Sequence, residues 1–210
     1  MSTDSKTGQY TTEQEKFWAG EFGAGYRQRN DDDKLLMSKI ARFSRILHSA
    51  PRVESIMELG CNIGLNLVAL GKLNPGFKLN GYEINAESAD VARGYGVDVT
   101  TGTILQKIPE DRKYDLVFTS GVLIHINPDE LGKVYDNLYS LSKKYVLVNE
   151  YYNPTPVTVE YRGHSDRLFK RDFAGELMDR YDLKLVDYGF GYHRDNYFDG
   201  DDTTWFLLSK

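Results

Sequence analysis

The 210-residue sequence is poor in cysteine and has no long apolar run. Cys61 is its one cysteine, so no disulfide can form within the chain, and a single thiol fits a reducing compartment. No apolar run approaches the roughly 18 residues that a membrane span requires. Residues 1–10 are polar and lack a signal-peptide core. We therefore expect a cytoplasmic protein with no membrane partner and no disulfide framework.

Positive charge is also scarce. The chain has 26 Lys and Arg against 31 Asp and Glu, which gives a formal net charge of −5. Binding to a phosphate backbone requires clustered cations, so we expect no nucleic-acid partner. Hydrophobic residues make up 40% of the chain, enough for the core of one domain. The 15 Tyr and 10 Phe residues either fill the edge of that core or line a pocket.

The N-terminal quarter has helical patterns. We expect a disordered tail over residues 1–11 and a helical unit over residues 12–50. Thr12 and Glu15 have the spacing of a capping box, which predicts a helix start. Glycines at 20, 23 and 25 then predict a loop. A second helix is expected from about 33 to 47, because its apolar residues recur every three or four positions.

From residue 51 onward, short apolar runs alternate with helical patterns. Helices are expected near 63–70, up to about 93, from 127 to 141 and from 172 to 181. This alternation predicts a mostly parallel sheet with helices on both faces. The last two strands leave no room for a helix, so we expect them to pair antiparallel. The strands are expected at 55–59, 78–84, 97–104, 114–119, 145–149, 183–189 and 204–208.

A glycine-containing turn after the first strand is the strongest motif. Residues 58–66 read Glu-Leu-Gly-Cys-Asn-Ile-Gly-Leu-Asn and open a helix. A dinucleotide site would have G-x-G-x-x-G, whereas this chain has Gly60-x-x-x-Gly64 with an acid two residues earlier. The stretch resembles motif I of class I S-adenosylmethionine (SAM)-dependent methyltransferases, E/D-x-G-x-G-x-G, with Asn62 at the middle glycine. The alternative is an ordinary tight turn.

This resemblance implies a Rossmann-like α/β fold: a seven-stranded, mostly parallel sheet with one antiparallel strand, preceded by a helical lid. SAM is the implied cofactor, and residues 51–210 form its domain. Glu83 ends the second strand, where an acid can accept both ribose hydroxyls. NAD enzymes use the same arrangement, and a solvated loop carboxylate is the alternative. The remaining residues predicted to bind cofactor are Glu58, Gly60, Cys61, Asn62, Gly64, Asn66, Ile84, Thr103, Ile104, Ser120 and His125.

Within that set, Thr103 and His125 have more specific expected roles. In the methyltransferases the position of Thr103 touches the adenine, usually through Asp. Residues 120–126 resemble the segment that runs beneath SAM towards the acceptor. His125 is a base, a wall of the SAM pocket, or a histidine satisfied by a backbone group.

The segment over about 150–172 is expected to form the acceptor loop. Four cations and one acid lie between residues 162 and 171, and Arg holds carboxylate or phosphate with two parallel hydrogen bonds. A solvated loop is the alternative. Asp172 is expected to be a helix cap. The residues predicted here to bind substrate are Tyr151, Tyr152, Tyr161, Arg162, His164, Arg167 and Arg171.

Nearly the whole chain resembles one family, the methyltransferases associated with pseudaminic acid biosynthesis. The similarity covers residues 17–23, 26–30, 58–66, 121–128, 151–173, 187–190 and 204–207. It implies that Trp18, Tyr26, Arg29 and Asn30 are lid residues over cofactor and acceptor. Tyr26 and Arg29 are expected to touch the cofactor, and Trp18, Tyr26 and Asn30 the substrate.

The predicted reaction is transfer of a methyl group from SAM to a small, anionic acceptor, such as an acidic sugar or sugar nucleotide. A carboxylate or phosphonate metabolite is the alternative acceptor. His125, His164 and Glu150 are the candidate bases. The four histidines are scattered, so no metal is expected. A dehydrogenase using NAD and a non-catalytic SAM- or nucleotide-binding module are the competing classes. Either a monomer or a homodimer is expected.

Overall fold

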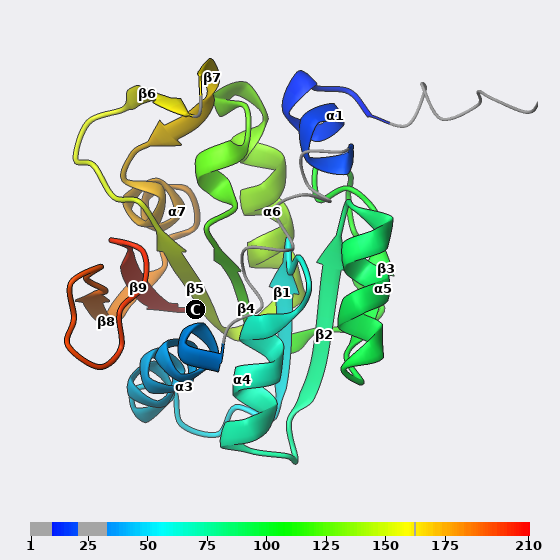
Figure 1. The fold of residues 1–210 in the computed structure, drawn as a ribbon, viewed down its shortest axis with the longest axis vertical. Coiled ribbons are helices and arrows are strands. Elements are labelled where there is room, and N and C mark those ends of the chain that lie inside the picture. Colours follow the sequence, from blue (N-terminus) through cyan, green and yellow to red (C-terminus); the bar gives the residue numbers. More distant parts are fainter. Residues whose placement is uncertain (1–9, 21–32, 162) are drawn as a thin grey trace, which may run out of the picture.

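Seven strands form the central sheet of this computed structural model, which describes residues 10–20, 33–161 and 163–210, without the side chains of residues 33, 164 and 165. The strand order is β3-β2-β1-β4-β5-β9-β8 (Figure 1). The strands are β1 (Ser55–Leu59), β2 (Lys78–Glu83), β3 (Asp98–Thr101), β4 (Tyr114–Ser120), β5 (Ser142–Glu150), β8 (Lys184–Phe190) and β9 (Thr204–Ser209).

The sheet is parallel except for one strand. β1 pairs parallel with β2 and β4, and β4 pairs parallel with β5. β9 runs antiparallel to both of its neighbours, β5 and β8. This confirms the predicted seven-stranded sheet with one reversed strand. Because β1 lies between β2 and β4, the chain reverses its direction of travel across the sheet at β1, where ligands of open α/β folds bind.

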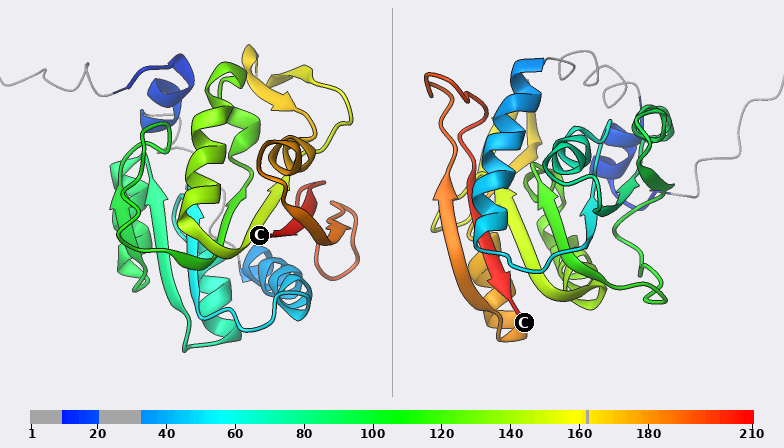
Figure 2. Two further views of the ribbon diagram at one scale, coloured as in Figure 1. Left: turned by 180° about the vertical axis from the view of Figure 1, so that it is seen from behind. Right: turned by 90° about the horizontal axis from the view of Figure 1, so that it is seen from below.

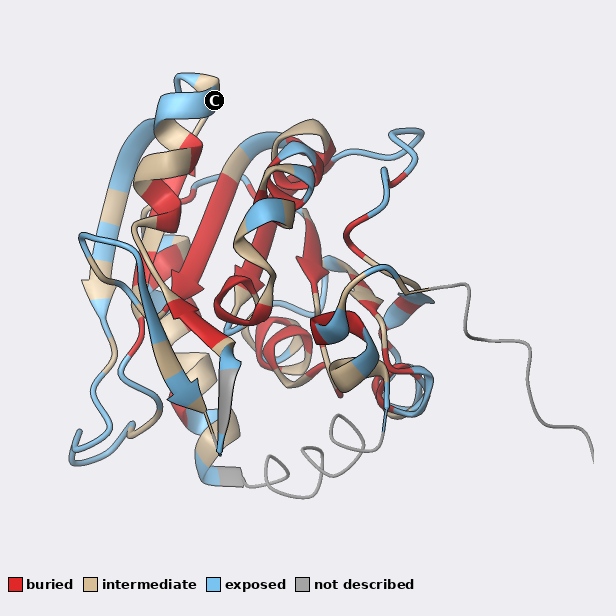
Figure 3. Cartoon of the chain, turned by 90° about the horizontal axis from the view of Figure 1, so that it is seen from above, coloured by how far each residue is buried: buried red, intermediate tan, exposed pale blue. Residues whose placement is uncertain are grey.

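Helices cover both faces of the sheet. α3 (Asp33–His48), α4 (Leu65–Leu73) and α5 (Ala86–Gly94) pack on one face, where Phe43, Phe118 and Trp205 belong to the buried cluster. α6 (Leu131–Leu141) and α7 (Phe173–Tyr181) pack on the other face (Figure 2). The central strands are consequently buried, and β8 at the edge is more exposed (Figure 3).

The predicted N-terminal helices are present. α1 (Glu13–Ala19) begins with the expected capping box, in which the Thr12 side chain accepts from the Glu15 backbone and the Glu15 side chain accepts from the Thr12 backbone. α3 matches the second predicted helix. The predicted tail lies outside the described residues except at Tyr10 and Thr11. Within the described part of the chain, no helix is long and apolar enough to cross a membrane.

The segment expected to be an acceptor loop contains a hairpin. β6 (Val157–Tyr161) and β7 (His164–Lys170) pair antiparallel, outside the main sheet. Gly163 in the turn has φ +82°, a conformation that glycine adopts without steric cost. The loop expectation was therefore wrong for most of this segment. β6 does alternate apolar and polar residues, but it is only five residues long, and β7 is rich in charge and lacks that alternation.

Gly189 tests how closely β8 packs against β9. A Cβ atom added there would lie 2.6 Å from the ring of Trp205, which is buried and has little room to move. We expect Gly189→Ala to lower the free energy of unfolding by roughly 1–3 kcal/mol. The matched control is Gly94→Ala at the end of α5, where a Cβ meets nothing within 4 Å. Chemical denaturation of both variants checks this, and equal stabilities would contradict it.

Candidate functional site

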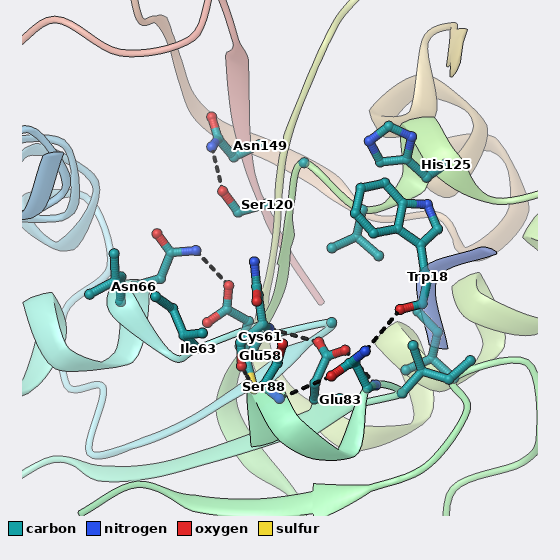
Figure 4. Close-up of a pocket in the computed structure, with 18 of the residues that line it drawn as sticks. Trp18, Glu58, Cys61, Ile63, Asn66, Glu83, Ser88, Ser120, His125 and Asn149 are labelled. Atoms are coloured by element: carbon teal, nitrogen blue, oxygen red, sulfur yellow. Dashed lines mark hydrogen bonds between the residues drawn. The ribbon is translucent and has the colours of Figure 1, made fainter. Parts of the chain in front are cut away.

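One large cavity opens at the carboxyl ends of the central strands (Figure 4). α1 and α3 wall it on two sides, and the turn from β1 into α4 forms its floor. Its lining includes most of the predicted cofactor residues. These are Glu58, Gly60, Cys61, Asn62, Asn66, Glu83, Ile84, Thr103, Ile104, Ser120 and His125.

The β1–α4 turn has the tight geometry that its sequence predicts. Gly60 and Gly64 have φ +80° and +79°. An added Cβ would lie 2.7 Å from Val122 at Gly60 and 2.9 Å from Ala92 at Gly64, so neither position accommodates a side chain. Asn62 has φ 49°, a left-handed conformation that asparagine tolerates better than most residues. Asn62 therefore fulfils the conformational need of the motif's middle glycine.

Glu83 is held rigidly at the end of β2. Its Oε2 accepts from the Asn62 backbone N–H at 2.7 Å, and its Oε1 accepts from the Asn85 N–H at 2.8 Å. Burial raises the pKa of Glu83, which is 7% exposed, although these backbone amides lower it. An ionised carboxylate has about four lone-pair sites. Two remain for a ligand, which suits a pair of adjacent hydroxyl groups.

Glu58 lies at the centre of a buried polar relay. Its Oε1 accepts from Asn66 Nδ2 at 2.5 Å, and Lys39 Nζ donates to Asn66 Oδ1 at 2.8 Å. Glu58 Oε2 has no hydrogen-bond partner among the described residues. Burial raises the pKa of Glu58 and lowers that of Lys39. This region of the cavity can therefore bind a group that carries both a donor and an acceptor.

The sequence analysis missed Lys39. It comes from α3, which was expected to be a lid with a purely apolar face. The signal was a lysine three residues after Leu36 and one before Ile40, next to the apolar stripe of that helix.

His125 lies at the opposite end of the cavity, beside α1 (Figure 4). Its Nδ1 is 2.7 Å from the carbonyl oxygen of Arg167. The rings of Trp18 and Tyr161 lie 4.5 and 5.2 Å away between centroids. Burial lowers the pKa of His125 to about 4, so the ring is neutral at pH 7. A neutral ring that donates from Nδ1 presents Nε2 as an acceptor.

Thr103 is joined to α1. Its hydroxyl donates to the Glu15 carboxylate, which also lines the cavity. A carboxylate of the N-terminal helix therefore lies beside position 103. Asn85 Nδ2 faces the backbone oxygens of residues 18–20, at 3.3 to 3.4 Å. α1 is therefore fastened over the strand ends by side chains from two loops of the sheet.

Most of the predicted acceptor residues that the structure describes lie outside the cavity lining. Arg171 pairs with Glu176 at 2.6 Å, and the Arg167 guanidinium lies 5.5 Å from the Phe17 ring centroid. Tyr151, Tyr152 and Tyr161 likewise do not belong to the lining, whereas Trp18 does. Tyr26, Arg29, Asn30 and Arg162 lie outside the described residues, as does the side chain of His164.

Glu150 is buried beneath the cavity wall. Its Oε1 accepts from the Val122 N–H at 3.1 Å. Burial raises the pKa of Glu150 to about 7, although neighbouring backbone amides oppose this. Glu150 does not belong to the cavity lining. In the described residues, no three His, Cys, Asp or Glu side chains are grouped so that they could hold a metal ion.

Comparisons with known proteins give matches in structure. No protein-family model matches the chain, and no curated protein matches it in sequence. A SAM-dependent methyltransferase from Archaeoglobus fulgidus is 15% identical, with a TM-score of 0.67, and the match covers 90% of this chain and 100% of that chain. Magnesium protoporphyrin IX methyltransferase from Synechocystis with bound S-adenosylhomocysteine (SAH) is 13% identical, with a TM-score of 0.68 and coverage of 93% and 97%. Streptomyces venezuelae DesVI is 14% identical, with a TM-score of 0.63 and coverage of 95% and 99%. These similarities establish the predicted Rossmann-like methyltransferase fold.

The buried His125 makes stability depend on pH. The unfolded imidazole has a pKa near 6.5, whereas the native one has a pKa of about 4. Between these values the unfolded chain binds the additional proton, so the free energy of unfolding falls as the pH drops. From pH 6.5 to 4, we expect wild type to lose up to about 3 kcal/mol more than His125→Gln. Denaturant unfolding at several pH values checks this, and parallel profiles for the two proteins would contradict it.

Proposed function

We propose that this protein is an enzyme that transfers a methyl group from SAM to a small molecule. One observation carries the proposal. The glycine turn after β1 and the buried Glu83 after β2 face one cavity, in a chain with the methyltransferase fold. Gly60 itself lines this cavity, so a ligand can approach the backbone there.

Each part of SAM has complementary groups in the cavity. Glu83 accepts from the ribose hydroxyls, and Ile84, Thr103 and Ile104 border the adenine. The methionine end would lie near Gly60. There Lys39, which donates to Asn66, would face its carboxylate, and Glu58 Oε2, which has no partner in the described residues, would accept from its ammonium group.

SAM supplies an electrophilic methyl group: the sulfur–carbon bond breaks with its electron pair on sulfur, and a lone pair of the acceptor forms the new bond. The protein aligns the acceptor and excludes water. A hydroxyl acceptor also gives up its proton to a base or to water, and an amine acceptor reacts in its neutral form, which carries the lone pair. Of the candidate bases whose side chains are described, His125 lines the cavity and Glu150 does not.

His125 is better suited to accepting a hydrogen bond than to removing a proton from the acceptor. A pKa of about 4 makes the neutral ring a weak base at pH 7, because its protonated form is strongly acidic. Its Nε2 can accept a hydrogen bond while Nδ1 donates to the Arg167 carbonyl oxygen. The Trp18 ring beside it restricts the shape of a bound molecule.

The acceptor itself is a further part of the proposal. The resemblance in sequence to methyltransferases of pseudaminic acid biosynthesis supports an acidic sugar or sugar nucleotide, with a carboxylate or phosphonate metabolite as the alternative. The net charge of −5 supports a small molecule rather than a nucleic acid, and the single cysteine fits a reducing compartment such as the cytoplasm.

Replacement of Glu83 tests the cofactor assignment. Glu83→Ala removes two charge-assisted hydrogen bonds to the ribose, so SAH binding should weaken by roughly 2–4 kcal/mol. Glu54→Ala is the matched control, because Glu54 is exposed and remote from the cavity lining. Calorimetric titration of SAH gives the affinities. Circular dichroism shows whether Glu83→Ala remains folded. If it does not, the SAH affinity of Glu83→Gln, which keeps the side-chain shape, is measured instead. Unchanged affinity in both Glu83 variants would refute the assignment.

A further inference from the structure

A row of polar side chains crosses the sheet at the α3 side of the cavity. Glu58 is in register with Phe118, Ser120 with Asn149, and Asn149 with Trp205. Alternate residues of a strand share a face, so Glu58, Ser120, Asn149 and Thr203 lie on the face that α3 covers. All four line the cavity. The row begins at the proposed methionine end of the cofactor and continues past it, towards β9.

Two buried oxygens at the far end of this row lack partners. Asn149 and Thr203 are 3% and 5% exposed. Asn149 Nδ2 donates to Ser120 Oγ at 2.8 Å, but Asn149 Oδ1 and Thr203 Oγ1 have no hydrogen-bond partner among the described residues. A buried polar atom without a partner is costly and uncommon. An amide oxygen only accepts, so its partner must be a donor such as a hydroxyl or an amine.

Arg42 of α3 completes this end of the cavity. A Cβ added at Gly191 or Gly200 would lie 3.0 or 3.2 Å from its Nη2, so two glycines make room for the guanidinium. Within the described residues, Arg42 makes neither a hydrogen bond nor an ion pair. Burial lowers its pKa, and the charge of Asp201 opposes this. A confined guanidinium with five uncommitted donors is suited to an anion.

Arg42 and Lys39 lie one turn apart on α3, and the charge of Asp201 acts on both, but their nearest neighbours differ. Lys39 donates to Asn66, near Gly60 and the proposed carboxylate of the cofactor. Arg42 instead packs against the segment before β9, where Gly200, Asp201 and Thr203 also line the cavity. Arg42 thus lies at the part of the cavity that the proposed cofactor does not contact.

We infer that Arg42, Asn149 and Thr203 form the acceptor subsite, which takes a small anionic molecule bearing a hydroxyl or amino group. The anion binds the Arg42 guanidinium, and the hydroxyl or amine donates to Asn149 Oδ1. This inference rests on the proposed methyl transfer. It places the acceptor's charge on α3, instead of on the arginines of the β6–β7 region that the sequence suggested.

The test uses the full chain, SAM and two pools of small molecules. A deproteinised cell extract is separated on an anion exchanger into a retained, anionic pool and an unretained pool, and SAH formation is measured with each. We expect turnover with the anionic pool. Arg42→Gln should raise KM for that pool roughly tenfold or more, because it loses a charge-assisted, bidentate contact. Arg42→Lys should return KM only part of the way to the wild-type value, since lysine lacks the planar guanidinium that can donate two parallel hydrogen bonds.

The controls separate this inference from the proposed function. Arg45→Gln, an exposed arginine on the same helix, should leave KM unchanged. The SAH affinity of Arg42→Gln should stay within about twofold of the wild-type value, because the inferred acceptor contacts of Arg42 do not involve the cofactor. Turnover confined to the unretained pool, unaltered kinetics in Arg42→Gln, or a large loss of SAH affinity in that variant would overturn the subsite. Absence of SAH binding or of turnover by wild type would instead overturn the proposed methyl transfer.

Discussion

The hydrogen bonds between the Glu83 carboxylate and two backbone amides organise the site. One amide belongs to Asn62 in the turn after β1, and the other to Asn85 at the start of α5. Gly60 and Cys61 reinforce this link by donating to the Tyr82 carbonyl at 2.8 and 2.9 Å. The carboxylate thereby fixes two neighbouring strand ends at the point where the sheet changes direction. A ligand that binds Glu83 meets a preformed surface, which lowers the entropic cost of binding.

The two ends of the cavity differ in their chemistry, and this difference decides how a bound molecule is oriented. Near α1, aromatic rings enclose the neutral His125. Near α3, Lys39 and Arg42 face a polar row that ends at Thr203. A molecule with an apolar, stacked part and a charged, hydroxylated part therefore has one favoured orientation.

Features that depend on local sequence were predictable. The apolar periodicity revealed every strand of the main sheet, and the acid–glycine spacing located the turn and Glu83. Contacts between distant segments were not predictable in the same way. Asn149 and Arg42 approach one cavity because β9 inserts beside β5 and α3 crosses the sheet face, and neither is visible in a local pattern. Arg171 illustrates the same limit: a local cation excess does not reveal which internal partners neutralise it, and Glu176 pairs with Arg171.

The most direct test of the account is calorimetric titration of the wild-type chain with SAH and, separately, with NAD. The Gly60–Gly64 spacing and the polar relay through Glu58 suit a nucleoside joined to an amino acid, and they lack the helix-facing glycine pattern that a pyrophosphate requires. We predict saturable binding of one SAH per chain and no detectable heat with NAD. Binding of NAD with no binding of SAH would contradict the account.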